Sequence, residues 1–422
     1  IIMSSVIDMY AKSGSMSEAQ KVFSDLHSND VVSWGALIDG YAQNGQGHAA
    51  LESYINMLHG DVTSPNEVVF LGVLKACGNI GAIVYGMLTH VQILERELES
   101  NVSIGSALVD MYTKCKCLGE AYHVFIRLRG RNIVSWGAMI AGLSQCDQEL
   151  HAFQLFDEMI AYGMQPNRVI ILCILKACGA IEAHENGMLI HDLVLQMGLS
   201  SDLAIGNTLV HMYAKCGNLK GAQKVFDVLN PDVVSFGALI SGYSHQGHGV
   251  FALDLFRQMQ AKGIKPERAT FLSLLRACAH MGAGRHGNLI YGQIVENQLD
   301  SGLLISNALV DMYAKTGRLY DAYKIYTQMS SQDVVSCGTM IEGFTQQGDN
   351  EVARVILKGM SDTGVKPDDA IFSSILTGCS NAGLLEEGHE FFMTMKETYG
   401  IIPTTKHYGS LIDLLARAGK HY

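Results

Sequence analysis

The sequence predicts an all-α fold: an α-solenoid, a right-handed superhelix of about 13 stacked helix-turn-helix repeats with no β-sheet. Two observations predict it. The chain of 422 residues repeats itself with a period near 101 residues, and apolar residues within each period recur at the spacing of amphipathic helices. Hydrophobic residues make up 48% of the chain, enough for a core. One helix pair cannot bury its apolar face alone, so neighbouring pairs must stack.

The period is visible in short segments that return along the chain. The segment 31–38, which reads VVSWGALI, returns at 133–140, 233–240 and 334–341. The tetrapeptide MYAK at 9–12 and the tetrapeptide LKAC at 74–77 return with the same steps of 100 to 102 residues, the last copy of LKAC only loosely. The chain is therefore one continuous array rather than a set of separate domains.

Each period divides into three units, which we call the first, second and third units of a triplet. In the first full triplet they span 31–66, 67–101 and 102–132. Each unit holds two helical patterns of roughly 12–15 residues, separated by polar residues and glycine. A glycine such as Gly163 is expected just after a helix, where a left-handed residue ends it, and Pro166 follows as a stop. The chain thus divides into a nearly complete third unit, three full triplets and a last incomplete triplet: 1–30, 31–132, 133–232, 233–333 and 334–422.

The net charge, the cysteine content and the length of the apolar runs each disfavour a class of protein. The net charge of −11 disfavours a generic polyanion binder held by bulk electrostatics. Ten cysteines without dense disulfide spacing favour a reducing compartment. The longest apolar run, 169–175, has seven residues, too few to span a membrane, so we expect no membrane partner. The chain starts at Ile1 with neither an initiator Met nor a targeting segment, and we interpret it as a fragment.

The sequence predicts no catalytic residue, cofactor, metal ligand or small-molecule substrate. The zinc-deaminase signature H-x-E with a downstream P-C-x-x-C is absent, as are a P-loop and a nucleophile elbow. Four cysteines recur once per period, too far apart along a solenoid to share one metal ion, and are expected to be small buried residues. These are Cys77, Cys178, Cys278 and Cys379.

Three segments carry a resemblance to a known family: VVSWGALIDGYAQNG, LGVLKACGNIGAIVYGMLTH and SALVDMYTKC. They resemble the pentatricopeptide repeat family, in its plant subclass with alternating P, L and S repeats, which correspond to the first, second and third units. The segment 365–419 is similar to the closing P2-L2-S2 triplet of that subclass. In the subclass, E domains and often a DYW cytidine-deaminase domain follow this triplet, and zinc would enter only with that domain.

The resemblance implies a function. Members of the family bind single-stranded RNA, about one base per repeat, and we expect this chain to be the recognition part of a mitochondrial or chloroplast RNA editing (C-to-U) or processing factor. Its partners would be organellar RNA and, in addition, editing-complex proteins or a deaminase acting in trans. A protein-binding scaffold without RNA specificity is the alternative, and the acidic net charge favours it.

The resemblance places base reading on two residues per repeat, one near the start of its first helix and one at its end. A carboxylate suits the N–H donor of uracil or guanine, and an amide donor suits the ring nitrogen of adenine or cytosine. A short Ser leaves room for a purine, whereas Asn reaches a pyrimidine. The third units then read G, A, U and U through the pairs Ser4 and Asp30, Ser106 and Asn132, Asn207 and Asp232, and Asn307 and Asp333.

The other units depart from this pattern. First units carry glycine at the helix-start position, so only their end residues remain: Asn66, Asn167, Glu267 and Asp368 would suggest A, A, no clear base and G. Second units carry Leu71, Leu172, Leu272 and Ser373 there and are expected to space or stack. Four recurring lysines are either phosphate contacts or a solvated helix face. They are Lys12, Lys114, Lys215 and Lys315.

Overall fold

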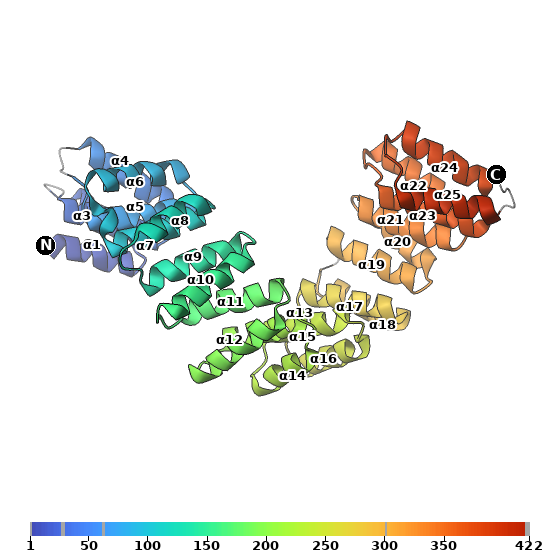
Figure 1. Ribbon diagram of the computed structural model, residues 1–422, viewed down its shortest axis with the longest axis horizontal. Helices are drawn as coiled ribbons and strands as arrows, with labels where there is room; N and C mark the ends of the chain where they lie inside the picture. Colours follow the sequence, from blue (N-terminus) through green and yellow to red (C-terminus); the bar gives the residue numbers. More distant parts are fainter. Residues whose placement is uncertain (1, 27–29, 61–63, 300–301, 418–422) are drawn as a thin grey trace. The chain divides into compact units, whose positions relative to one another are not determined.

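The computed structural model describes residues 2–26, 30–60, 64–299 and 302–417. Over these residues it contains 25 α-helices, one short 3-10 helix and no strand (Figure 1). The helices alternate along the chain as the first and second helices of successive repeats, and α25 is the first helix of a thirteenth repeat. The predicted all-α solenoid is confirmed. No helix in these ranges is long and apolar enough to cross a membrane.

The first helix of each unit begins directly after the end of the preceding unit. These helices are α1 (Ile2–Lys12), α3 (Val31–Gln43), α5 (Glu67–Ile80), α7 (Val102–Lys114), α9 (Ile133–Gln145), α11 (Arg168–Ala180), α13 (Leu203–Lys215), α15 (Val233–His245), α17 (Arg268–Met281), α19 (Leu303–Lys315), α21 (Val334–Gln346), α23 (Asp369–Ala382) and α25 (Thr405–Arg417).

The second helices return antiparallel to the first. They are α2 (Met16–Ser24), α4 (Gly47–His59), α6 (Ile83–Glu95), α8 (Leu118–Arg127), α10 (Glu149–Ala161), α12 (His184–Gln196), α14 (Leu219–Val228), α16 (Gly249–Ala261), α18 (Gly284–Glu296), α20 (Leu319–Gln328), α22 (Asn350–Thr363) and α24 (Leu385–Glu397), and the 3-10 helix η1 spans Leu98–Ser100. After α10, Gly163 adopts φ +78°, the left-handed conformation expected for a residue that ends a helix.

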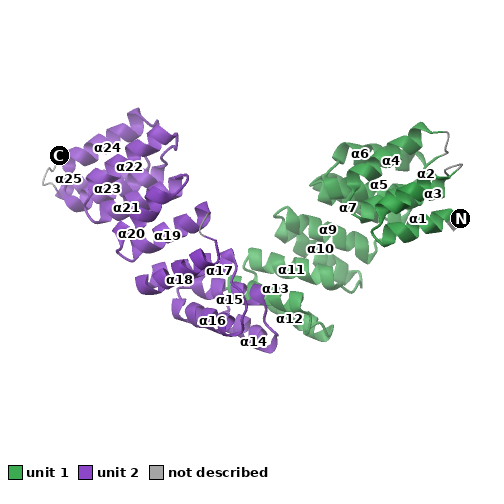
Figure 2. Ribbon diagram, turned by 180° about the vertical axis from the view of Figure 1, so that it is seen from behind, with its two compact units in different colours: residues 1–216 green, residues 217–422 purple. Residues whose placement is uncertain are grey.

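The chain forms two compact units, Ile1–Cys216 and Gly217–Tyr422 (Figure 2). Within each, first helices pack against the first helices of neighbouring repeats, as α3 does against α1 and α5, and second helices pack beside the first helices of their repeats, as α4 does beside α3. Small residues allow the close approach: a Cβ placed on Gly86 of α6 would meet Met111 Sδ at 2.5 Å. The first helices thus form one continuous layer in each compact unit, and they carry the candidate base-reading residues.

The core uses the recurring apolar positions. Phe125 and Trp136 lie edge to face with ring centroids 4.8 Å apart, and Trp136 is 1% exposed. The four recurring cysteines are fully buried, and burial raises the pKa of the Cys77 thiol to about 12. Their interpretation as packing residues is confirmed. Within the described ranges no cluster of histidine, cysteine and acidic residues could hold a metal ion.

Candidate functional site

The end residue of each third unit is the N-cap of the helix that follows it. Asp30, Asn132, Asp232 and Asp333 each accept a hydrogen bond through Oδ1 from the backbone N–H three residues on, at 2.8, 2.9, 3.0 and 2.8 Å. The donor is a serine in every case, and its hydroxyl bonds back to the cap residue, which completes a capping box. A cap of this kind stabilises a helix by roughly 1 kcal/mol.

The cap fixes the orientation of the side chain and therefore of its second terminal atom, Oδ2 of an aspartate or Nδ2 of an asparagine. Because Oδ1 is held by the helix, the second carboxylate oxygen of an aspartate, or the amide nitrogen of an asparagine, takes no part in the cap. An aspartate at this position therefore offers an acceptor, whereas Asn132 offers a donor. The end residues Asn66, Asn167 and Asp368 cap in the same way at 3.1, 3.0 and 3.0 Å, but the longer Glu267 makes no side-chain cap bond.

Two of the four predicted pairs are joined directly by hydrogen bonds. Ser106 Oγ lies 3.2 Å from Asn132 Oδ1, and Asn307 Nδ2 donates to Asp333 Oδ2 at 2.9 Å. Ser106 is only 3% exposed, whereas Asn307 Oδ1 is buried and has no hydrogen-bond partner in the described part of the chain. The helix-start residue and the end residue, 26 positions apart in sequence, thus form one polar site.

The members of the other two pairs take the same places on their helices. Ser4 on α1 and Asn207 on α13 are each 8% exposed, and their partners cap α3 and α15. Asn207 belongs to the first compact unit and Asp232 to the second.

Electrostatics keep two of the cap carboxylates ionised. The backbone N–H and hydroxyl of Ser33 lower the pKa of Asp30. Burial alone would raise the pKa of Asp333, but hydrogen bonds from Ser336 and Asn307 outweigh it, and that pKa is lowered as well. Both side chains are therefore acceptors only at neutral pH, as recognition of an N–H donor requires.

One of the joined pairs opens into a groove of about 390 Å³ in the first compact unit. This Ser106 groove is lined by Asp39 of α3, Leu71 and Lys75 of α5, Ser106 and Lys114 of α7, and Asn132. Val134, 58% exposed, forms part of its wall and offers an apolar surface. The predicted adenine pair and one predicted phosphate contact thus line a single groove.

The recurring lysines are the last residues of their helices, and three are paired with an aspartate one turn earlier. The distances are 2.6 Å for Lys12 to Asp8, 2.7 Å for Lys114 to Asp110 and 2.9 Å for Lys315 to Asp311. Pairs as exposed as these are weak. In the remaining copy, His211 occupies the aspartate position before Lys215. The repeat itself contains the signal for these pairs, an aspartate four residues before the lysine in three of the four copies.

The glycines of the first units lie beside the helix that follows. A Cβ on Gly35 would approach Val68 Cγ1 to 3.3 Å, and one on Gly137 would approach Ile170 Cγ1 to 3.5 Å. In the second units, the side chain of Asp202 is held in an ion pair by Arg168. The end residue paired with Leu172 is thus already engaged, which agrees with a spacing rather than a reading role.

Comparisons with known proteins identify the family. The model of the PPR repeat matches residues 1–31, 32–62, 134–164, 207–229 and 305–334, that of the PPR repeat family matches 231–280, and that of the pentatricopeptide repeat domain matches 331–382 and 355–417. The chain belongs to the pentatricopeptide repeat family.

Relatives from Arabidopsis thaliana align with nearly the whole chain. A chloroplastic pentatricopeptide repeat-containing protein is 34% identical over 99% of this chain and 52% of its own length, and a mitochondrial one is 34% identical over 100% and 55%. This chain therefore spans little more than half the length of these relatives.

Solved structures share the fold. PPR10 in complex with an 18-nt psaJ RNA element superposes with a TM-score of 0.63 at 21% identity, covering 99% of this chain and 72% of that one. PPR10 from maize gives 0.55 at 16% identity, covering 99% and 76%.

Proposed function

We propose that this pentatricopeptide repeat chain binds single-stranded RNA sequence-specifically, about one base per repeat, as the recognition part of an organellar RNA editing or processing factor. The observation that carries the proposal is the helix cap, which holds Oδ1 of the third-unit end residues and at Asn132 makes the amide nitrogen the donor that a base would meet. The RNA-bound PPR10 structure and the chloroplastic and mitochondrial names of relatives support it.

The cap determines which bases fit. With Oδ1 of Asn132 held by Ser135, the amide nitrogen faces outward as a donor, which matches the ring nitrogen of adenine or cytosine. The small Ser106 beside it leaves room for a purine, so the pair selects adenine. An aspartate at the same place presents an acceptor for the N–H of uracil or guanine, and Asn307 reaches the smaller uracil at Asp333. The four third units read G, A, U and U.

The lysines of the Ser106 groove indicate only a few contacts to the phosphates of the RNA. Lys75 and Lys114 in the Ser106 groove can contact phosphates, but Lys114 is paired with Asp110. With few such contacts, affinity should fall only slowly with salt, by a slope of roughly −0.7 for each phosphate neutralised on a single strand.

We assign the units to P, L and S repeats of the plant subclass, with boundaries 1–30, 31–132, 133–232, 233–333 and 334–422. A deaminase domain or a deaminase in trans would supply editing chemistry.

The decisive experiment exchanges the cap residues while keeping the caps. Asn132→Asp and Asp333→Asn are compared with the unchanged chain in selection from a randomised single-stranded RNA pool. Because Asp and Asn cap equally well, folding should be unaffected. One adenine should become guanine in the first variant, and one uracil should become cytosine in the second, each by about tenfold in relative affinity.

A matched control is Asp349→Asn. Asp349 caps the second helix α22, accepting from Val352 N at 3.3 Å, and lies outside the proposed base-reading positions. This variant should leave the selected motif unchanged. A motif that ignored both cap exchanges would refute base reading by the end residues, and a pool without enrichment would refute RNA recognition altogether.

A protein-binding scaffold is the second candidate. A leucine recurs at one exposed position on the second helices α6, α12 and α18, with exposed fractions of 57%, 68% and 69% for Leu88, Leu189 and Leu289. The recurrence of the same exposed apolar residue in three second units is the observation that favours a protein partner. Failure of RNA selection would make this the leading function; success would leave these leucines available for a partner of the RNA-bound chain.

A further inference from the structure

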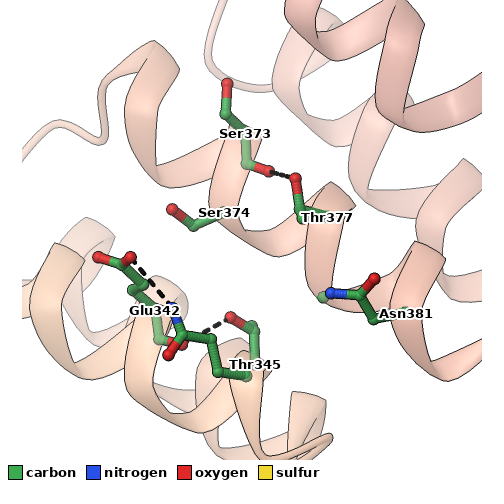
Figure 3. A pocket seen from close by; sticks show the side chains of 8 residues that line it. Glu342, Thr345, Ser373, Ser374, Thr377 and Asn381 are labelled. Carbon is green, nitrogen blue, oxygen red and sulfur yellow. Dashed lines mark hydrogen bonds between the residues drawn. The ribbon is translucent and has the colours of Figure 1, made fainter. Parts of the chain in front are cut away.

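A second groove, of about 220 Å³, lies between α21 and α23 in the second compact unit (Figure 3). Its lining includes Glu342, Thr345 and Gln346 from α21 and Ser374, Thr377 and Asn381 from α23. We call it the hydroxyl groove. Figure 3 shows that its residues come from two facing helices and that several are engaged in bonds along their own helix.

Three of the four hydroxyl groups that line this groove donate their protons to their own helix. Thr345 donates to the carbonyl of Glu342 at 3.0 Å, Ser374 to that of Ala370 at 3.1 Å, and Thr377 to that of Ser373 at 2.8 Å. A hydroxyl has one proton and two lone pairs, so these three oxygens can only accept a further hydrogen bond, and the carboxylate of Glu342 adds more acceptors. The remaining donors are the hydroxyl of Ser373 and the amides of Gln346 and Asn381. Acceptors outnumber donors, so a ligand group that donates a hydrogen bond fits this groove.

Phosphate is the wrong ligand for this groove. Its oxygens accept hydrogen bonds and carry negative charge, and Glu342 would repel them. The other second units place Lys75, Lys176 and Arg276 at the position of Thr377, so this repeat lacks the cation that the others have. The groove also extends along α23 toward Asn381, away from the Asp368 cap at its start where a base would be read.

We propose that the hydroxyl groove binds a ribose 2′-hydroxyl of single-stranded RNA. The 2′-hydroxyl is the one hydrogen-bond donor of the RNA backbone, and DNA lacks it. The single proton of the 2′-hydroxyl can go to Ser374, Thr377 or Glu342, and Asn381 can donate to its oxygen. Thr377 Oγ1 also lies 3.3 Å from Ser410 Oγ of α25 and keeps one lone pair for the groove. The closing repeats would thus discriminate RNA from DNA. This inference rests on the proposed RNA-binding function and adds a contact to the sugar.

The test uses the full chain and its selected RNA ligand. Oligonucleotides with a single 2′-deoxy substitution at each position in turn are measured against the all-ribose strand. One position should lose affinity by roughly three- to tenfold, the size of one or two neutral hydrogen bonds. In Ser374→Ala combined with Thr377→Val, the same substitution should cost nothing further. Thr363→Val is the control, because Thr363 makes the same kind of backbone bond on α22 outside the groove, and it should retain the deoxy penalty.

Two results would overturn the inference while RNA recognition stands: equal binding of every 2′-deoxy strand, or a penalty that persists in the Ser374 and Thr377 double variant. If the chain bound no RNA, the proposed function would fail and this inference with it. Circular dichroism of the double variant checks its fold.

Discussion

Lys75 lines the Ser106 groove in the first compact unit, and Thr377, the ninth residue of the equivalent helix, lines the hydroxyl groove in the second. Both grooves also contain an acidic residue from a first-unit helix, Asp39 in one and Glu342 in the other. The Ser106 groove holds two lysines and a capped amide, whereas the hydroxyl groove holds no cation and is lined by hydroxyl groups, amides and one carboxylate. On the same helical scaffold, the exchange of a lysine for a threonine at this position changes the charge of a groove and with it the ligand group that we expect there.

A second contrast lies in the packing between repeats, where the largest effect is expected. Phe125 packs on Trp136 in the first compact unit, and the equivalent rings Phe226 and Phe236 in the second keep this edge-to-face contact. One triplet further along, the equivalent contact is a hydrogen bond of 3.3 Å between Tyr326 and Cys337. Trp136→Ala should therefore lower the free energy of unfolding by about 3–5 kcal/mol. Cys337→Ala should cost only about 1 kcal/mol.

Urea unfolding followed by circular dichroism measures both variants under one set of conditions. Both sites are 1% exposed, so the comparison isolates side-chain volume and ring contact from burial. Equal losses would show that the aromatic contact contributes nothing beyond filling a buried position.

The next largest effect concerns Lys75 and Thr377, the ninth residues of the second-unit helices α5 and α23. Lys75→Thr should weaken RNA binding and make its salt slope shallower by about 0.7, whereas Thr377→Lys, which exchanges a hydroxyl acceptor for a cation, should steepen the slope by a similar amount. Lys224→Thr, an exposed lysine on the second helix α14, is the control and should change neither quantity. Slopes are read from dissociation constants at four or more salt concentrations; slopes that stay constant in both variants would contradict phosphate binding at this position.

The sequence predicts the features that depend on residues close together in the chain, but not those that depend on residues far apart in it. The fold, the helix pairs and the buried cysteines follow from the repeat because they depend on local periodicity. The pattern Asp30-x-x-Ser33, repeated in every triplet, is a capping-box signal that could have shown what holds the end residues. The hydroxyl groove could not be found in this way. Its acceptors lie about 30 residues apart on α21 and α23, and their chemistry depends on which backbone carbonyl each hydroxyl bonds.

The smallest expected effect is a difference between the two compact units in how their stability depends on pH. In the first, His90 and His191 each bond through Nδ1 to a tyrosine hydroxyl at 2.9 Å, Tyr112 and Tyr213 respectively. The second unit has tyrosine and phenylalanine at the equivalent positions. Burial lowers the pKa of both histidines, partly opposed at His90 by the carboxylate of Glu99.

The lowered pKa fixes the direction of the pH effect. As pH falls below the ordinary histidine value of about 6.5, the unfolded chain takes up protons before the folded one, so stability is lost until the folded pKa is passed. His191→Tyr, which copies the residue found at this position in the second compact unit, should reduce the acid-induced loss between pH 7.5 and 5.5 by at most about 1 kcal/mol. Urea midpoints at the two pH values measure it. An unchanged loss in the variant would mean that His191 takes up its proton equally in the folded and the unfolded chain, and would contradict a lowered pKa in the folded state.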